Sequence, residues 1–80
     1  MLLCINVRNS IISFGCFDNA GDMVASFDIS SDVRKTSDEY LFIIKSILKD
    51  RGIDLSNISG AILSSVVPAL TDTVIKTVVK

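Results

Sequence analysis

Residues 2–29, LLCINVRNSIISFGCFDNAGDMVASFDI, decide the fold of this chain. Two short polar segments divide this stretch into three apolar runs at residues 2–7, 11–17 and 23–29. The runs are rich in β-branched and aromatic residues, which favour strands, and turn-forming residues separate them. Because the connections are short, consecutive strands pair antiparallel. The stretch therefore predicts a three-stranded antiparallel meander, with Gly15 marking a bulge or a close approach.

The two connections of this meander carry most of its polar groups. The first, NVRNS at residues 6–10, brings amide, guanidinium and hydroxyl groups between two apolar strands. From the residues alone, an ordinary polar hairpin turn is the simpler interpretation, and a phosphate site is the alternative. The second, residues 18–22, contains Asp18 and Asp22, which we interpret as solvated turn carboxylates rather than metal ligands.

Residues 37–51 carry apolar side chains at helical spacing, and both ends of the pattern have boundary signals. Thr36 precedes the pattern and Glu39 follows three residues later, which is the spacing of a capping box. Gly52 comes directly after it, as is typical of a residue that ends a helix. The apolar positions are Tyr40, Leu41, Ile44, Ile47 and Leu48. We predict a helix over 37–51, with Tyr40 in the core.

The rest of the chain predicts one more strand and one more helix. Residues 53–60 form a connector with room for a short helical turn, and residues 60–64 are a brief apolar strand. Because a long helix precedes it, this strand is expected to lie parallel to a strand of the meander. Pro68 falls near the first turn of the last helix. The apolar side of that helix is expected to comprise Leu70, Val74, Ile75 and Val78.

The order of elements is therefore β-β-β-α-β-α, an α/β fold in which helices pack on a mixed sheet. A chain of 80 residues forms one domain at most. The last strand leaves an open edge at residues 61–64, and natural proteins normally cover or pair such an edge.

Composition excludes several classes of protein. A net charge of −1 gives no electrostatic footprint for nucleic acid. No apolar run approaches the roughly 18 residues of a membrane span. The first residues have no positively charged segment, which disfavours a secretory signal, so we expect a cytoplasmic protein. The sequence has no histidine, which excludes Cys/His zinc sites and His-based triads. Cys4 and Cys16 are expected to be reduced and packed as small hydrophobes.

Four segments together resemble type III pantothenate kinase, a member of the actin-like, sugar-kinase and Hsp70 superfamily of ATPases. They are the opening strand with its turn, the hairpin at residues 18–22, SDVRKTSDEY at 31–40 and ILSSVVPALT at 62–71. The SSVVP segment after a strand is the most specific of them. The resemblance spans essentially the whole chain, but family members are much longer. It therefore implies a partial ribonuclease H-like or actin-like ATPase domain over residues 1–80, with a further domain after Lys80.

The resemblance implies the function of the first turn. Family members phosphorylate pantothenate with ATP, Mg²⁺ and a monovalent cation (K⁺ or NH₄⁺), the first committed step toward coenzyme A. Their turn reads Asp-Val/Ile-Gly-Asn-Thr, so the phosphate-binding positions here are Asn6, Val7, Arg8, Asn9 and Ser10. Asn9 matches the family, and Ser10 keeps the hydroxyl. Asn6 replaces the aspartate that helps to hold the metal, and Arg8 replaces a glycine, so we expect impaired metal-ATP chemistry.

No catalytic residue can be assigned, because the pantothenate pocket, the catalytic base and the adenine-binding segment lie further along in the family. Ser64 and Ser65 have no base near them in the sequence, and Arg34 and Lys35 are expected to be exposed loop charges. This stretch alone is therefore expected to be inactive. One alternative is a non-catalytic remnant that acts as a dimerising interaction module. A small nucleotide-binding sensor is another, but Asn6 argues against it.

Overall fold

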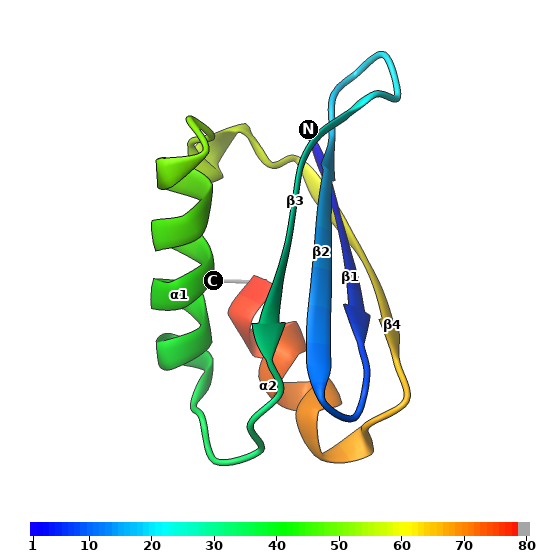
Figure 1. Ribbon diagram of the computed structural model, residues 1–80, viewed down its shortest axis with the longest axis vertical. Coiled ribbons are helices and arrows are strands. Elements are labelled where there is room, and N and C mark those ends of the chain that lie inside the picture. Colours follow the sequence, from blue (N-terminus) through cyan, green and yellow to red (C-terminus); the bar gives the residue numbers. More distant parts are fainter. Residues whose placement is uncertain (79–80) are drawn as a thin grey trace.

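The computed structural model describes residues 1–78 and contains four strands, two α-helices and one 3₁₀ helix (Figure 1). In chain order the elements are β1 (Leu2–Val7), β2 (Ile11–Phe17), β3 (Met23–Ser30), α1 (Ser37–Asp50), η1 (Leu55–Asn57), β4 (Gly60–Ser65) and α2 (Pro68–Val78). This is the predicted β-β-β-α-β-α order, and the bounds of the four strands and of α1 differ from the predicted ones by at most one residue. The connector after α1 does contain a short helical turn.

The four strands form one mixed sheet in the order β3-β2-β1-β4. β1 pairs antiparallel with β2 and parallel with β4, while β2 and β3 pair antiparallel. The predicted meander and the predicted parallel strand are both confirmed. As a result, β1, β3 and β4 all run in the same direction, and their carboxyl ends lie along one edge of the sheet.

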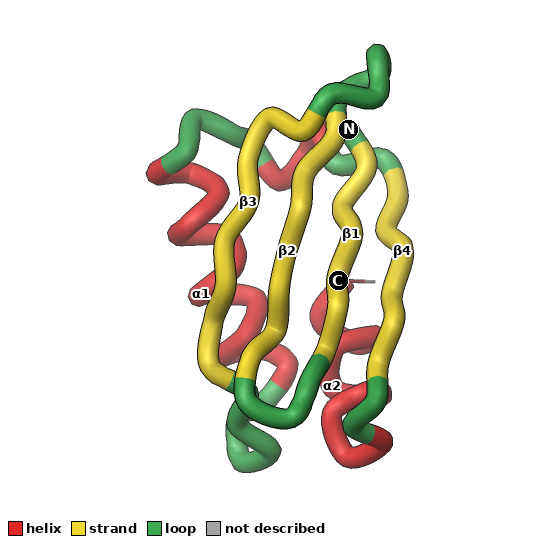
Figure 2. Tube along the Cα trace, turned by 45° about the vertical axis from the view of Figure 1, so that its right-hand side comes forward, coloured by secondary structure: helices red, strands yellow, loops and turns green. Residues whose placement is uncertain are grey.

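Both α-helices cover the same face of the sheet (Figures 1 and 2). We call this the inner face. The opposite face, over which no helix of residues 1–78 lies, is the outer face. Alternation along β1 sends Leu3, Ile5 and Val7 inward, where they are buried, while Asn6 is exposed on the outer face. The buried core consists of Leu3, Ile5, Val7, Ile12, Phe14, Cys16, Phe27, Tyr40, Ile44, Leu48, Ile53, Leu70 and Val74.

The ends of α1 are fixed by the predicted signals. The Glu39 N–H donates to Thr36 Oγ1 at 3.2 Å, and the Thr36 N–H donates to Glu39 Oε1 at 3.0 Å, so the capping box is complete. The helix ends at Asp50, one residue earlier than predicted, with Arg51 as the C-cap. Gly52 follows with φ +78, a conformation that other residues rarely adopt.

Tyr40 ties the loop before α1 to the core. Its side chain is 1% exposed, as predicted for a core residue. Its hydroxyl donates to the Asp32 carbonyl oxygen at 2.7 Å and accepts from the Asp32 N–H at 2.9 Å. Hydrogen bonds from the Arg34 side chain and backbone hold the pKa of the Asp32 carboxyl below its ordinary value. Hydrogen bonds therefore hold both the backbone and the side chain of Asp32.

The face of α2 that packs inward differs from the prediction. Leu70 and Val74 are buried, but Ile75 is 41% exposed. Thr77 is buried instead at 2% exposure, with the carbonyl oxygens of Thr73 (2.9 Å) and Ser37 (3.3 Å) as hydrogen-bond partners. The side chain of Val78 lies outside the described part of the structure.

The reason for this difference is helical periodicity. Leu70, Val74 and Thr77 follow the i, i+4, i+7 spacing of one helical face, whereas Ile75 lies a further 100° around the helix from Val74. The assignment by hydrophobicity alone was wrong for Ile75, because a threonine whose hydroxyl can bond to its own helix is tolerated in the core.

The two cysteines lie on opposite faces of the sheet and are both free. Cys16 is buried among the core residues, and burial is the main cause that raises the pKa of its thiol. Cys4 belongs to the outward-facing positions of β1 and is only half-buried, so the expectation of two buried thiols was wrong for Cys4. The irregularity expected near Gly15 is a register shift between Cys16 and Phe17, and the Phe17 ring lies close over Gly15.

Among residues 1–78, no helix is long and apolar enough to cross a bilayer.

The capping box of α1 provides a test of the fold. Replacing Thr36 by alanine removes the side-chain acceptor of the Glu39 N–H, and we expect it to lower the free energy of unfolding by about 1 kcal/mol. Urea denaturation followed by circular dichroism measures this change. Ser46→Ala, at an exposed position inside the same helix, is the control and should cause no loss. Equal stability of the Thr36→Ala variant and the parent would contradict the assignment.

Candidate functional site

The exposed turn between β1 and β2 lies at the carboxyl edge of the sheet. The Arg8 N–H donates to the Ile11 carbonyl oxygen at 2.9 Å, which closes the turn, and Arg8, Asn9 and Ser10 are exposed. Within residues 1–78, the backbone N–H groups of Asn9 and Ser10 have no protein acceptor. Successive unpaired N–H groups and short polar side chains are what an anion-binding turn offers.

This turn does not require the glycine that the family pattern has at position 8. No residue other than glycine has a positive φ in the described structure, so the backbone of Arg8 adopts an ordinary conformation. Arg8 therefore closes the turn without backbone strain. What it changes is the surface of the turn, to which it adds a positively charged guanidinium.

Two other connections hold the turn in place. From the β3–α1 loop, the Ser31 hydroxyl donates to the Arg8 carbonyl oxygen at 2.8 Å, and the Ser31 N–H donates to the Ser10 carbonyl oxygen at 3.0 Å. From the β4–α2 connection, the Val66 N–H donates to the Val7 carbonyl oxygen at 3.1 Å. Three connections thus meet at the carboxyl edge, where open α/β sheets commonly bind their ligands.

A row of polar side chains crosses the outer face next to the turn. In the strand register, Asn6 of β1 lies opposite Ser13 of β2 and Ser64 of β4, and Ser13 lies opposite Asp28 of β3. We call these four residues the polar row. The Arg8 guanidinium folds back over the outer face and donates to the Ser13 hydroxyl. The predicted phosphate-binding residues are therefore neighbours of a polar surface that the sequence alone did not reveal.

Ser64 and Ser65, adjacent in the sequence, have different roles. Ser64 belongs to the polar row, whereas the Ser65 hydroxyl accepts hydrogen bonds from the Val67 N–H (3.2 Å) and the Thr71 hydroxyl (3.0 Å). These contacts fix the first turn of α2.

The residues at this turn do not fit a divalent-cation site by themselves. Asn6 offers a neutral amide oxygen, and residues 1–78 contain no group of three His, Cys, Asp or Glu side chains that could hold a metal ion. Asp18 instead uses its carboxylate to accept the N–H groups of Ala20 and Asp22, both at 3.0 Å. Asp18 is therefore a turn carboxylate, and its turn lies at the opposite end of the sheet from residues 6–10.

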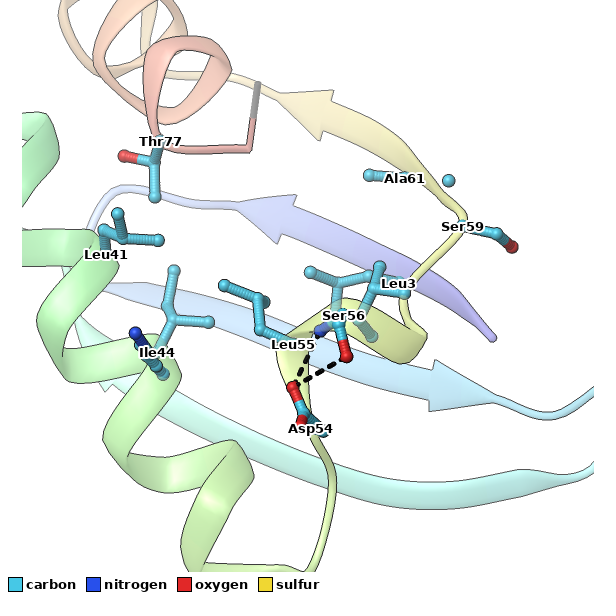
Figure 3. A pocket seen from close by; sticks show the side chains of 12 residues that line it. Leu3, Leu41, Ile44, Asp54, Leu55, Ser56, Ser59, Ala61 and Thr77 are labelled. Carbon is cyan, nitrogen blue, oxygen red and sulfur yellow. Dashed lines mark hydrogen bonds between the residues drawn. The ribbon is translucent and has the colours of Figure 1, made fainter. Parts of the chain in front are cut away.

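Among the hollows formed by residues 1–78 are two that each have a volume of about 530 Å³. The hollow on the outer face runs from the polar row to an apolar end formed by Phe17, Met23 and Ile62. The other lies between α1, η1, β4 and the end of α2 (Figure 3). Its apolar walls include Leu41 and Leu55, and no pattern in the sequence predicted it. It lies at the end of the sheet away from the turn, so it does not belong to the candidate site.

The fold and the turn define a class of protein. The mixed sheet with its parallel β4, two helices on one face and a polar turn at the carboxyl end of β1 corresponds to part of an actin-like ATPase domain. The family model for type III pantothenate kinase matches residues 2–80. The chain belongs to the type III pantothenate kinase family.

Individual relatives agree with this assignment. The chain is 46% identical over 72 residues to the type III pantothenate kinase of Geotalea daltonii, covering 89% of this chain and 27% of that protein. It is 40% identical over 81 aligned residues to that of Moorella thermoacetica, covering 100% of this chain and 31% of that protein. The chain spans less than a third of the length of these relatives.

The two faces of the sheet predict different reactivity for the two thiols. In the folded protein, an alkylating reagent should modify Cys4 much faster than Cys16, because Cys16 is fully buried and its raised pKa disfavours the thiolate. Mass spectrometry after brief iodoacetamide treatment should therefore find one label natively and two in denaturant. Cys4→Ser should abolish the native label. Equal labelling of both thiols under native conditions would show that the sheet is not formed as described.

Proposed function

We propose that this chain is the N-terminal part of a cytoplasmic type III pantothenate kinase-like protein that transfers phosphate from ATP to pantothenate. The observation that carries the proposal is the braced turn at residues 6–10, where Asn9 and Ser10 are exposed and their N–H groups have no protein acceptor within residues 1–78. Here the turn contacts the phosphate groups of ATP. The names of the relatives supply the substrate, and the family match supports carrying it to this chain.

In this proposal the chain supplies only one wall of the active site. The pantothenate pocket, the adenine contacts and the catalytic base belong to the part of the whole protein that lies further along, after Lys80. The Mg²⁺ and the monovalent cation (K⁺ or NH₄⁺) used by the family would need ligands from that part too, because Asn6 provides no charge. Residues 1–80 alone bind, orient and partly neutralise the phosphates.

A chimera tests this division of labour. Residues 1–80 replace the matching first part of the Moorella thermoacetica relative, and phosphopantothenate formation is measured with ATP and Mg²⁺. The chimera should turn over slowly, and Asn6→Asp with Arg8→Gly should raise turnover about tenfold or more, because the carboxylate restores a metal contact.

Two controls accompany the chimera. Asp18→Asn, in the turn at the far end of the sheet, should leave the rate unchanged. Residues 1–80 by themselves should form no product. A double variant no faster than the unmodified chimera, or turnover by the 80-residue chain, would overturn the proposal.

A second candidate is the non-catalytic dimerising module, and the free edge of β4 favours it. Within residues 1–78, β4 pairs with β1 alone, and the outward-facing Ile62 beside the open edge is 56% exposed. Unpaired strand edges with exposed apolar side chains promote pairing between chains. In this case two copies would associate through β4.

Light scattering distinguishes the two candidates. If the chain is a dimerising module, it should elute as a discrete dimer, and Ile62→Glu should convert it to a monomer by placing a charge beside the edge. Phe42→Glu is the matched control, since Phe42 is 74% exposed on α1, on the other side of the sheet. A chain that is monomeric, or that aggregates without a defined size, would rule the module out.

A further inference from the structure

We propose that Arg8 binds the phosphate groups of a nucleoside triphosphate directly, so that this turn holds them without a divalent cation. The inference rests on the proposed function for the location of the phosphates. It goes beyond that function because it assigns the charge at the site to a side chain of this chain rather than to a metal ion.

The first observation is the position of the guanidinium. Arg8 follows the last residue of β1, and its side chain folds back over the outer face to donate to the Ser13 hydroxyl. Because β1 and β2 pair Asn6 with Ser13, this contact places the guanidinium above the middle of the polar row. The side chain is thus fixed at the site instead of extending into solvent.

The second observation is that no carboxylate of the described residues lies within ion-pair distance of the Arg8 guanidinium. Within residues 1–78, Arg8 takes part in no ion pair, whereas the nearby loop pairs Asp32 with Arg34 and Lys35. A guanidinium has five N–H donors, and Arg8 uses its side chain in a single hydrogen bond to a neutral hydroxyl. The remaining donors form the planar fork that binds phosphate oxygens well.

The surrounding charges restrict where an anion can sit. Asp28 lies at the β3 end of the polar row, opposite Ser13, and its carboxylate repels an anion from that side. On the other side are the amide of Asn6 and the hydroxyl of Ser64, which are neutral and can donate hydrogen bonds. Neighbouring strands lie about 5 Å apart, so both groups are within reach of one phosphate held by Arg8.

The same residues explain why a divalent cation is not needed at this position. An aspartate at position 6 would repel phosphate unless a cation lay between them, whereas the amide of Asn6 does not. The residues also disfavour a bound metal, since a positive guanidinium lies close to Asn6 and residues 1–78 contain no acidic cluster that could hold a metal ion. Arg8 and Asn6 therefore act together, one adding a positive charge and the other removing a negative one.

Calorimetric titration of the 80-residue chain with ATP, and separately with tripolyphosphate, tests the proposal. Each titration is run once in excess EDTA and once with Mg²⁺. We expect binding in EDTA at an affinity equal to or higher than that with Mg²⁺. Arg8→Gln should weaken binding in EDTA by about tenfold or more, because it removes charge-assisted hydrogen bonds. Asn6→Asp should make binding depend on Mg²⁺.

Lys49→Gln is the charge-matched control, since Lys49 lies exposed in the last turn of α1 on the other side of the sheet, and it should change nothing. Circular dichroism confirms that each variant is folded. Binding that occurs only with Mg²⁺, or that survives Arg8→Gln unchanged, overturns this inference and leaves the proposed function standing. Absence of binding in every condition also overturns it. The proposed function is judged independently by turnover of the chimera.

Discussion

The structure depends on the pairing of β1 along both of its edges. β1 is bonded to β2 on one side and to β4 on the other, and its inward residues Leu3, Ile5 and Val7 are buried under the helices. Burying one such side chain stabilises the fold by about 1.5–3 kcal/mol. A register slip of one residue would put Asn6 inside and cost about 1–3 kcal/mol for its unpaired amide. The register of β1 is therefore strongly determined.

That register also builds the candidate site. The alternation that buries Ile5 and Val7 necessarily places Asn6 on the outer face, between Ser13 and Ser64. Because β4 runs parallel to β1, the turn after β1 and the connection after β4 meet at one edge of the sheet. The core and the polar row are two consequences of the same strand pairing, so the site cannot be displaced without unfolding the sheet.

The loop before α1 couples the helical layer to the turn. Tyr40 is buried in the core and holds the backbone of Asp32 through two hydrogen bonds. The adjacent Ser31 bonds to the backbone of Arg8 and Ser10. A buried helical residue thus restrains a loop that restrains the turn. The exposed groups of the turn are therefore held in place, and such preorganisation would reduce the entropy lost if a ligand were bound there.

The amino-acid sequence alone determined the local structure. Strand and helix boundaries, the capping box of Thr36 and the positive φ of Gly52 could be predicted, because each depends on neighbours a few residues away. The family and the turn at residues 6–10 were also recognisable from sequence. The buried face of α2 was predicted only in part. Whether Ile75 or Thr77 is buried depends on which side of the helix packs against the rest of the protein.

Only the tertiary structure decided which distant residues share a surface. The register of three strand pairs brings Asn6, Ser13, Asp28 and Ser64 into one row, and no sequence spacing encodes that row. The same is true of the direction of the Arg8 guanidinium, which depends on a hydroxyl five residues away across a hairpin. Local periodicity fixes which way each side chain points from its own strand. The neighbours it meets there follow from strand pairing and helix packing, which are interactions between segments far apart in the chain.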